Sequence, residues 1–253
     1  ADELGEITAF AHAASPRRRV FAAVNTVVRN SELGDVVDTL AVAAECGVDA
    51  VIVQDLGVAH IARKHFPGLS LHASTQMAIH SPAGAQALKG LGFRRVTLAR
   101  ELTLDEIAGI VSKSGIEVEV FIHGALCYSY SGLCLYSALL RSRSGNRGRC
   151  TYPCRDLFRQ DDEQEKAPSF PFSMKDLALP DDIAGLCSAS VASLKIEGRK
   201  KSALYVACAT AFYRALLDGT LTHERRSKLE ADMKTIFSRP WTRLYLDDNL
   251  NTD

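Results

Sequence analysis

One pattern repeats along this chain: a short β-branched run, a few polar residues, and then the apolar spacing of an amphipathic helix. The first clear case is the run 19–26, followed by a helix that Ser31 can cap and Gly47 can end. Further strands are predicted at 49–55, 69–76, 94–101, 116–124 and 191–199. Apolar strands that alternate with single helices predict an α/β fold with a parallel sheet covered on both faces.

Polar side chains lie at the carboxyl end of every predicted strand, and this distribution distinguishes between two kinds of parallel sheet. They are Asn25, Thr26, Gln54, Asp55, His72, Ser74, Thr75, Gln76, Arg100, Glu101, His123, Lys195, Glu197 and Arg199. A (β/α)8 barrel builds its site from all strand ends, whereas a doubly wound sheet concentrates it at one switch point. We therefore expect a TIM-like barrel. A closed barrel needs eight strands and only six are predicted, so we expect about two β/α units at its start to be missing.

Two segments depart from the repeat. Residues 125–167 form a long Cys-rich insertion, and insertions of this size are usually functional or disordered. Residues 219–253 form a tail that begins with an amphipathic helix at 222–237 and continues as an extended stretch. We thus expect a partial barrel over 1–218, carrying the insertion, and the start of an extension over 219–253.

The composition is that of an ordinary globular protein, with 47% apolar residues and 30 basic against 30 acidic side chains. This balance indicates no particular partner. No apolar run approaches the roughly 18 residues of a membrane span, and the start ADELGEITAF lacks the regions of a secretory signal. We therefore expect a cytoplasmic protein that does not enter a membrane.

Four of the seven cysteines lie in the insertion with the spacing C-x6-C-x15-C-x3-C; they are Cys127, Cys134, Cys150 and Cys154. An odd number of cysteines in a chain with a large core indicates reduced thiols. The spacing is neither that of a zinc finger nor that of the short ferredoxin runs. Four thiolates among arginines nevertheless favour an iron–sulfur cluster or a zinc ion over coincidence. We expect Cys46 and Cys187 to be core filler and Cys208 to be a reserve ligand.

The same stretch is rich in arginine and contains Tyr128, Tyr130 and Tyr152. The arginines are Arg141, Arg143, Arg147, Arg149, Arg155 and Arg159. A charge run is most often a solvated surface. Guanidinium groups beside aromatic rings also suit phosphates and unpaired bases, which makes RNA binding the alternative interpretation.

The segments EVFIHGALCYSYSGLCLYS, RSGNRGRCTYPCR and SLKIEGRKKS resemble peptidase family U32, the collagenase-like peptidases. The positions that match the family signature are Glu119, Phe121, Gly124, Ala125, Cys127, Gly132, Cys134 and Ser137. The resemblance continues through NTVVRNSELG, HASTQM, LARELTLDEI and FSMKDLALPDDI, up to about residue 218. The family's usual first section is absent before the strand VFAAVNT, in agreement with the strand count.

The resemblance implies two different activities. The family is named for proteolysis, whereas other members resemble RNA hydroxylases, some of them prephenate-dependent, and ubiquinone-ring hydroxylation factors that hold a 4Fe-4S cluster. The stretch TIFSRPWTRLYL is similar to the branch that forms 5-hydroxycytidine in large-subunit ribosomal RNA, and the transfer RNA uridine hydroxylases come next. The resemblance also implies that Cys127, Cys134, Cys150 and usually Cys154 are the cluster ligands.

A peptidase needs attack machinery that this sequence does not display. Neither H-E-x-x-H nor G-x-S-x-G occurs, and four cysteines around zinc would leave no open position for a water molecule. Hydroxylation of a pyrimidine is redox chemistry, which suits a cluster. We therefore rank the RNA hydroxylase first, the peptidase second and a non-catalytic cluster-bearing factor third, and leave the oligomeric state open.

Roles within the predicted rim remain hypotheses. We expect a first group to bind the base or a carboxylated co-substrate such as prephenate; it comprises His72, Gln76, Arg100, Glu101 and His123. The alternative for either histidine is a structural hydrogen bond at a strand end. A second group, Lys195, Glu197 and Arg199, alternates along one strand and so faces the barrel mouth, with a Glu197–Arg199 ion pair as the structural alternative.

Overall fold

The structure is a computed structural model that describes residues 2–159, 167–236 and 239–246. Its strands are β1 (Phe21–Val24), β2 (Ala50–Val53), β3 (Ser70–Ala73), β4 (Arg95–Thr97), β5 (Glu117–Ala125), β6 (Asp176–Ala178), β7 (Ser193–Ile196) and β8 (Trp241–Thr242). Its α-helices are α1 (Asp2–Ala13), α2 (Leu33–Glu45), α3 (Leu56–His65), α4 (Pro82–Gly90), α5 (Leu104–Ser114), α6 (Tyr136–Arg141), α7 (Ile183–Ser188), α8 (Ala203–Leu217) and α9 (His223–Ile236). Short 3-10 helices are η1 (Asn30–Glu32), η2 (Thr75–Met77), η3 (Tyr130–Gly132), η4 (Gly145–Arg147) and η5 (Pro153–Arg155).

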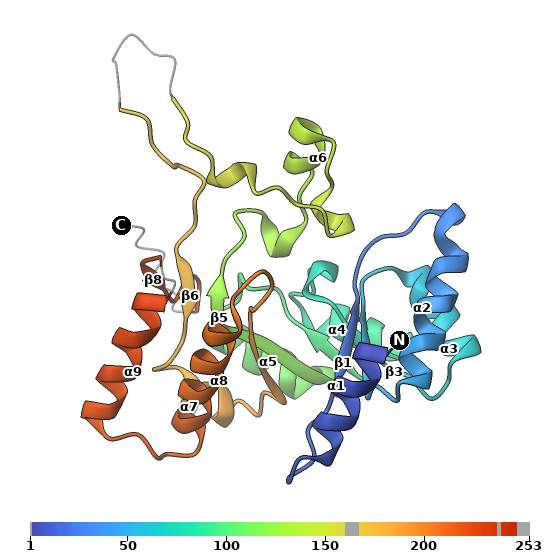
Figure 1. Ribbon diagram of the computed structural model, residues 1–253, viewed down its shortest axis with the longest axis horizontal. Coiled ribbons are helices and arrows are strands. Elements are labelled where there is room, and N and C mark those ends of the chain that lie inside the picture. Colours follow the sequence, from blue (N-terminus) through green and yellow to red (C-terminus); the bar gives the residue numbers. More distant parts are fainter. Residues whose placement is uncertain (1, 160–166, 237–238, 247–253) are drawn as a thin grey trace.

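The central sheet is mostly parallel, as the sequence predicts. β1, β2, β3, β4, β5 and β7 pair in parallel in that order, and they correspond to the six predicted strands. β6 and β8 were not predicted: β6 runs antiparallel to the end of β5, and β8 pairs with β6. Figure 1 shows α2 and α3 near one end of the sheet and α8 and α9 near the other.

The two end strands of the parallel series are more exposed than the strands between them. β1 and β7 contain no buried residue, whereas every residue of β4 is buried and β2 has a single half-buried position. In the described part of the chain, β1 pairs only with β2 and β7 only with β5, so these strands form an open sheet. A closed TIM-like barrel and missing first units therefore stay predictions.

Local sequence signals fix the ends of several helices. Asp55 caps α3 by accepting hydrogen bonds from the amides of Gly57 and Val58, at 2.8 and 3.2 Å. Thr103 and Glu106 form a capping box at the start of α5. The predicted cap at Ser31 is wrong, because Ser31 lies inside η1 and α2 begins after it, at Leu33.

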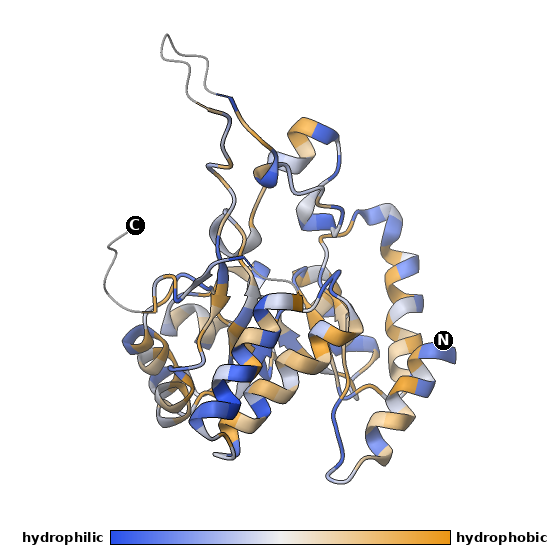
Figure 2. Ribbon diagram, turned by 60° about the vertical axis from the view of Figure 1, so that its left-hand side comes forward, coloured by the Kyte–Doolittle hydropathy of each residue, from blue (hydrophilic) through white to orange (hydrophobic). Residues whose placement is uncertain are grey.

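One apolar core joins the sheet to its helices and to the tail. Apolar residues run through the central strands, and the surrounding helices carry both apolar and polar residues (Figure 2). Met233 of α9 and Leu246 are buried in the same cluster as the strand residues, so the described tail packs onto the α/β unit. None of the described helices is long and apolar enough to cross a membrane.

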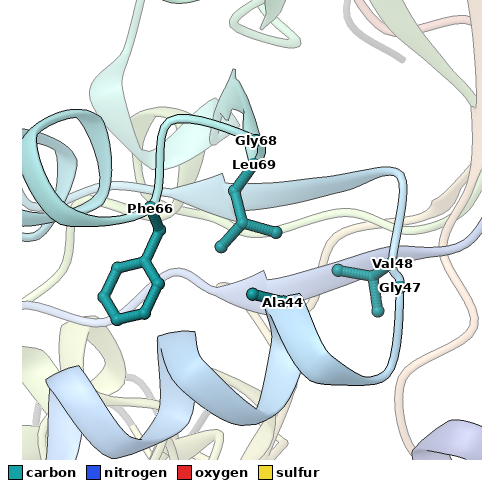
Figure 3. A pocket seen from close by; sticks show the side chains of 6 residues that line it. All are labelled: Ala44, Gly47, Val48, Phe66, Gly68 and Leu69. Carbon is teal, nitrogen blue, oxygen red and sulfur yellow. The ribbon is translucent and has the colours of Figure 1, made fainter.

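A small hollow of about 200 Å³ lies between the end of α2 and the turn after α3 (Figure 3). Its lining is apolar, with Phe66, Leu69 and Val48 as the larger side chains. Both turns lead into strands, so the hollow lies at the amino ends of β2 and β3. Because no polar side chain lines it, the hollow is not a candidate catalytic site.

Candidate functional site

A cavity of about 890 Å³ opens at the carboxyl ends of the strands. Its floor comes from residues at or after the ends of β1, β2, β3, β4, β5 and β7, and its roof comes from the insertion between β5 and β6, residues 126–175. Figure 1 shows that insertion rising above the sheet. The volume is in the range of small-molecule and cofactor sites.

All four insertion cysteines line this cavity; they are Cys127, Cys134, Cys150 and Cys154. The Sγ atoms of Cys134 and Cys150 each accept a hydrogen bond from the amide two residues later, at 3.3 Å, and the Ser129 amide serves Cys127 in the same way. Backbone donors to sulfur stabilise thiolates and are typical of cluster ligands. The structure thus brings together thiols that are spread over 28 residues of sequence.

The four thiols share one cavity but are not grouped as the ligands of a single ion. Among the described residues, no three histidine, cysteine, aspartate or glutamate side chains are grouped so that they could hold a metal ion. Zn–S bonds of about 2.3 Å would bring four sulfurs to within about 4 Å of one another. The four thiols line one cavity without that close grouping.

The electrostatic surroundings of the thiols are mixed. Burial raises the pKa of Cys127 and that of Cys154, which favours their neutral forms. The positive charges of Arg100 and Arg155 act in the opposite direction on Cys127 and Cys154 respectively. A group bound by these sulfurs must therefore displace protons from them, with nearby guanidinium groups offsetting the negative charge.

Arg100 and Lys195 provide two cations at the floor of the cavity, beside the ring of Phe121. The Arg100 guanidinium lies 4.0 Å from the ring centre, and the Lys195 Nζ lies 5.4 Å from it. Arg100 donates to the Ala125 carbonyl at 3.0 Å and lies 3.6 Å from Glu197. Its buried Nε has no partner within the residues that the structure covers. Burial lowers the pKa of Arg100, but a guanidinium keeps its charge.

Glu119, which sequence reasoning used only as part of a signature, anchors Lys195. Its buried carboxylate accepts hydrogen bonds from Thr97 at 2.9 Å, Ser193 at 2.8 Å and Lys195 at 2.8 Å. Arg95 lies 3.6 Å away and pairs with Glu117 at 2.7 Å. The available signal was the alternation of Glu117 with Glu119 in IEVEVF, which places both on one face of their strand.

Three residues predicted for the rim are not part of the cavity lining: His72, His123 and Glu101. His72 is buried and packs edge-on against Phe21, with ring centres 4.7 Å apart. His123 is enclosed by the rings of Tyr205, Tyr213 and Trp241, on the side of α8. Burial lowers the pKa of each histidine to about 4, so both are neutral at pH 7.

Glu101, the third of these, supports the insertion. Its carboxylate accepts hydrogen bonds from the amide and the hydroxyl of Ser131, at 2.7 and 2.6 Å. The Ser131 hydroxyl in turn lies 3.2 Å from the amide of Arg100, from which it accepts a bond. Glu101 therefore positions η3 against the strand ends instead of facing a ligand.

The remaining rim residues do line the cavity; they are Gln76, Arg100, Lys195, Glu197 and Arg199. The last three face one way, as the strand alternation predicts. The structural alternative was a side-chain ion pair between Glu197 and Arg199, and the two side chains have other partners instead. Glu197 accepts a bond from the backbone amide of Arg199, whose guanidinium donates to the carbonyl of Gly148.

The predicted RNA-binding arginines fall into two groups. Arg147 binds Glu32 and the Val27 carbonyl, and Arg155 donates to the Leu126 carbonyl at 2.9 Å, so both hold the insertion in place. Arg141 pairs with Asp156 at 2.5 Å. Arg143 and Arg149 are exposed, and no ion pair involves either within the described ranges. These two are the arginines best placed for phosphates.

The remaining cysteines stay away from the cavity. Cys46 and Cys208 pack against the core, in agreement with core filler for Cys46. Cys208, predicted as a reserve ligand, packs against the core on α8 and does not line the cavity. Cys187 is exposed on α7, so the prediction of core filler is wrong for this residue.

The fold and the site together define a class: an α/β protein whose cavity lies at the carboxyl ends of parallel strands, beneath a cysteine-bearing insertion. A solved U32 peptidase shares this fold, with a TM-score of 0.51 and 14% identity over 78% of this chain and 75% of that one. The model of peptidase family U32 matches residues 1–253. The chain belongs to peptidase family U32, which confirms the resemblance seen in the sequence.

Curated relatives carry names of two kinds. A 23S rRNA 5-hydroxycytidine C2501 synthase of Escherichia coli is 38% identical over 87% of this chain and 33% of its own length. A tRNA hydroxylation protein P of Helicobacter pylori is 34% identical over 94% of this chain and 59% of its own. An uncharacterized protease of Methanocaldococcus jannaschii is 35% identical over all of this chain and 65% of its own length. The chain thus spans a third to about two thirds of these relatives.

Proposed function

We propose that this chain forms the catalytic core of an RNA hydroxylase that modifies C5 of a pyrimidine. Cytidine in large-subunit ribosomal RNA is the first candidate substrate and uridine in transfer RNA the second. The names of the relatives from Escherichia coli and Helicobacter pylori support RNA as the substrate class. A base must leave its stack to reach a cavity at the strand ends, so the target is an unpaired or extruded nucleotide.

One observation carries the proposal: four thiols and four cationic side chains from separate elements line a single cavity. Histidine side chains that could form a hydrolytic triad are absent from this lining, and the two candidates from the sequence are buried elsewhere. A cavity with these groups suits redox chemistry on a bound ring better than attack on a peptide bond.

The residues that would hold the cofactor are Cys127, Cys134 and Cys150, with Cys154 as the fourth ligand. When bound, a 4Fe-4S cluster would supply one-electron redox chemistry at the roof of the cavity. Zinc is the alternative cofactor. The protein's part is to keep the thiols in one cavity and to direct backbone amides at them.

The floor of the cavity is suited to a small carboxylated co-substrate, for which prephenate is the candidate. Arg100 and Lys195 would bind carboxylate groups, since both are cationic and line the cavity. Glu197 holds Arg100 in place at 3.6 Å. Gln76 offers an amide to the edge of a base, in the same lining.

Mass spectrometry of nucleosides from ribosomal and transfer RNA of a deletion strain tests the proposal. We expect a 5-hydroxypyrimidine to disappear and to return with the wild-type gene and with Cys46→Ser, which changes a thiol outside the cavity. Cys150→Ser should not restore it. Unchanged nucleosides together with a loss of gelatin cleavage would instead favour the peptidase, which the name of the Methanocaldococcus relative keeps as the second candidate.

A further inference from the structure

Aromatic side chains gather where the insertion meets the mouth of the cavity. The insertion places Tyr128, Tyr136, Tyr152 and Phe172 in the cavity lining. Tyr128 is 55% exposed and Tyr152 is 38% exposed. Single exposed aromatic residues are common, but a group of them around a cavity marks a binding surface.

The ring of Tyr128 is held in place by a row of other rings. It lies 5.1 Å from the ring of Phe172 at an angle of 77°, and Phe172 lies 5.0 Å from Phe158 at 89°. These perpendicular contacts fix Tyr128 while leaving it more than half exposed. A flat ligand that stacks on it therefore loses little of its binding free energy to ordering the side chain.

Tyr152 occupies a backbone conformation that bulky residues rarely adopt, with φ 58° and ψ 44°. Such strain is concentrated at functional sites, where the surrounding structure maintains it. The conformation places the Tyr152 ring in the cavity lining, and the Nζ of Lys200 lies 5.1 Å from the ring centre. An aromatic face and a cation thus stand together at the mouth.

The insertion that carries these rings also carries two exposed arginines. Arg143 and Arg149 are exposed and make no ion pair among the residues described, and Arg149 lies between two residues of the cavity lining, Gly148 and Cys150. Exposed rings and arginines on one segment suit unpaired bases and the phosphates that link them. A duplex offers no free base faces to such a surface, because its bases already stack on one another.

We propose that Tyr128, Tyr152 and Phe172 form a stacking rim that binds unpaired RNA nucleotides beside the cavity. The substrate then arrives as a single-stranded or looped segment, not as a duplex from which the protein extracts a base. This inference rests on the proposed function, since it concerns how the same cavity receives RNA.

Fluorescence anisotropy with the full chain tests the rim, using a labelled single-stranded RNA oligonucleotide and the duplex of the same sequence at one salt concentration. Wild-type protein should bind the single strand more tightly. Tyr128→Ala and Phe172→Ala should each weaken that binding about tenfold, whereas Tyr128→Phe, which keeps the ring, should not. Tyr130→Ala is the matched control, because Tyr130 is 43% exposed on the same insertion but does not line the cavity.

The rim is refuted if Tyr128→Ala and Phe172→Ala bind the single strand as the control does, or if the duplex binds as tightly as the single strand. Circular dichroism and iron content of each variant separate a local loss of stacking from misfolding. Loss of binding in Tyr128→Ala, combined with unaltered nucleosides in the deletion strain, would support the rim and reject the hydroxylase. Altered nucleosides in the deletion strain, combined with wild-type binding by Tyr128→Ala, would support the hydroxylase and reject the rim.

Discussion

At the scale of single residues, Glu119 is a buried carboxylate that depends on several partners to stay ionised. Burial alone would raise the pKa of Glu119, but the charge of Lys195 and the hydrogen bonds from Lys195, Ser193 and Thr97 outweigh burial and lower it. The carboxylate is therefore ionised inside the sheet. It fixes Lys195 at the cavity floor and gives Arg95 a second carboxylate nearby.

Glu119→Gln should reduce the free energy of unfolding by about 3 to 5 kcal/mol, because it leaves buried cations without their shared counter-ion. Ser193→Ala removes one neutral donor to the same carboxylate and should cost only about 1 to 2 kcal/mol. Urea unfolding at pH 7 measures both. Equal small losses for the two variants would show that Glu119 is not the centre of this network.

The two buried histidines make stability depend on pH. Burial holds the pKa of His72 and of His123 at about 4, against 6.5 when exposed, and for His123 Asp176 acts against that shift. Between pH 6.5 and 4 the unfolded chain binds protons that the folded chain does not, so stability falls as the pH falls. Each histidine should contribute about 2 kcal/mol of loss between pH 7 and 5.

Urea unfolding at pH 7 and pH 5 tests this pH dependence with His123→Phe, which keeps a ring among Tyr205, Tyr213 and Trp241. The difference in unfolding free energy between the two pH values should shrink by about 2 kcal/mol in the variant. His60→Phe, at an exposed position on α3, should leave it unchanged. An unchanged difference in His123→Phe would mean that His123 is protonated in the folded state.

His123 also shows why part of the site could not be predicted. Alternation along β5 places Glu119 and Phe121 on the cavity side, and the same rule would place His123 there. The pairing of β5 with β7 instead shifts register between Phe121 and His123, which turns the histidine toward α8. Such an irregularity depends on two strands at once and leaves no mark in a single segment.

At the scale of elements, the contact between β5 and β7 depends on Gly124. Its φ is 115°, and a Cβ atom there would lie 2.7 Å from the Cβ of Glu197. The glycine therefore lets the strand carrying Lys195 and Glu197 approach β5 at the cavity floor.

Gly124→Ala should destabilise the protein by about 2 to 4 kcal/mol, since strain and a steric clash add. Gly109→Ala is the matched control: it lies in α5 with nothing within 4 Å of the added atom, and it should stabilise by about 0.5 to 1 kcal/mol. Thermal unfolding measures both. A neutral Gly124→Ala would mean that the two strands can separate at no cost.

The insertion is fastened to the rest of the protein across the cavity. Arg147 binds Glu32, and the Val27 amide donates to the Asn146 carbonyl at 3.2 Å, so η4 is tied to the segment after β1. Cys150 lies just beyond this tie. The contact thus helps to keep one of the thiols over the strand ends.

Glu32→Gln should loosen η4, because it replaces the carboxylate in a two-point contact with Arg147. Hydrogen exchange should become several-fold faster in peptides that cover 25–32 and 144–150. Glu230→Gln, which removes an ion pair within α9, serves as the control and should leave those peptides unchanged. Unaltered exchange in Glu32→Gln would show that the insertion is held by its backbone contacts alone.

The elements that were predicted correctly are those with a strong local pattern. The six parallel strands are apolar runs bounded by polar residues, and five of the six lie entirely within their predicted ranges. β6 and β8 were missed because they span three and two residues, too few for any period to appear. β6 forms because it lies beside β5, and β8, in the chain after α9, forms because it lies beside β6. Both pairings depend on the tertiary structure.

At the scale of the whole molecule, one arrangement links the fold to the proposed chemistry. Parallel strands direct their carboxyl ends toward one cavity, and an insertion from β5 closes over it with four thiols. The cysteine pattern identified this region from sequence alone. Other features became visible only in the packed structure. Cys208 does not line the cavity, and Glu119 fixes Lys195. Arg147 and Arg155 bind groups of the protein itself.

Iron and sulfide content after purification without oxygen tests the central claim most directly. The account predicts about four iron atoms and four sulfides per chain, with a brown colour that is lost in Cys127→Ser and Cys150→Ser and kept in Cys46→Ser. A colourless protein, a protein with one zinc, or iron that survives both cavity substitutions would contradict it.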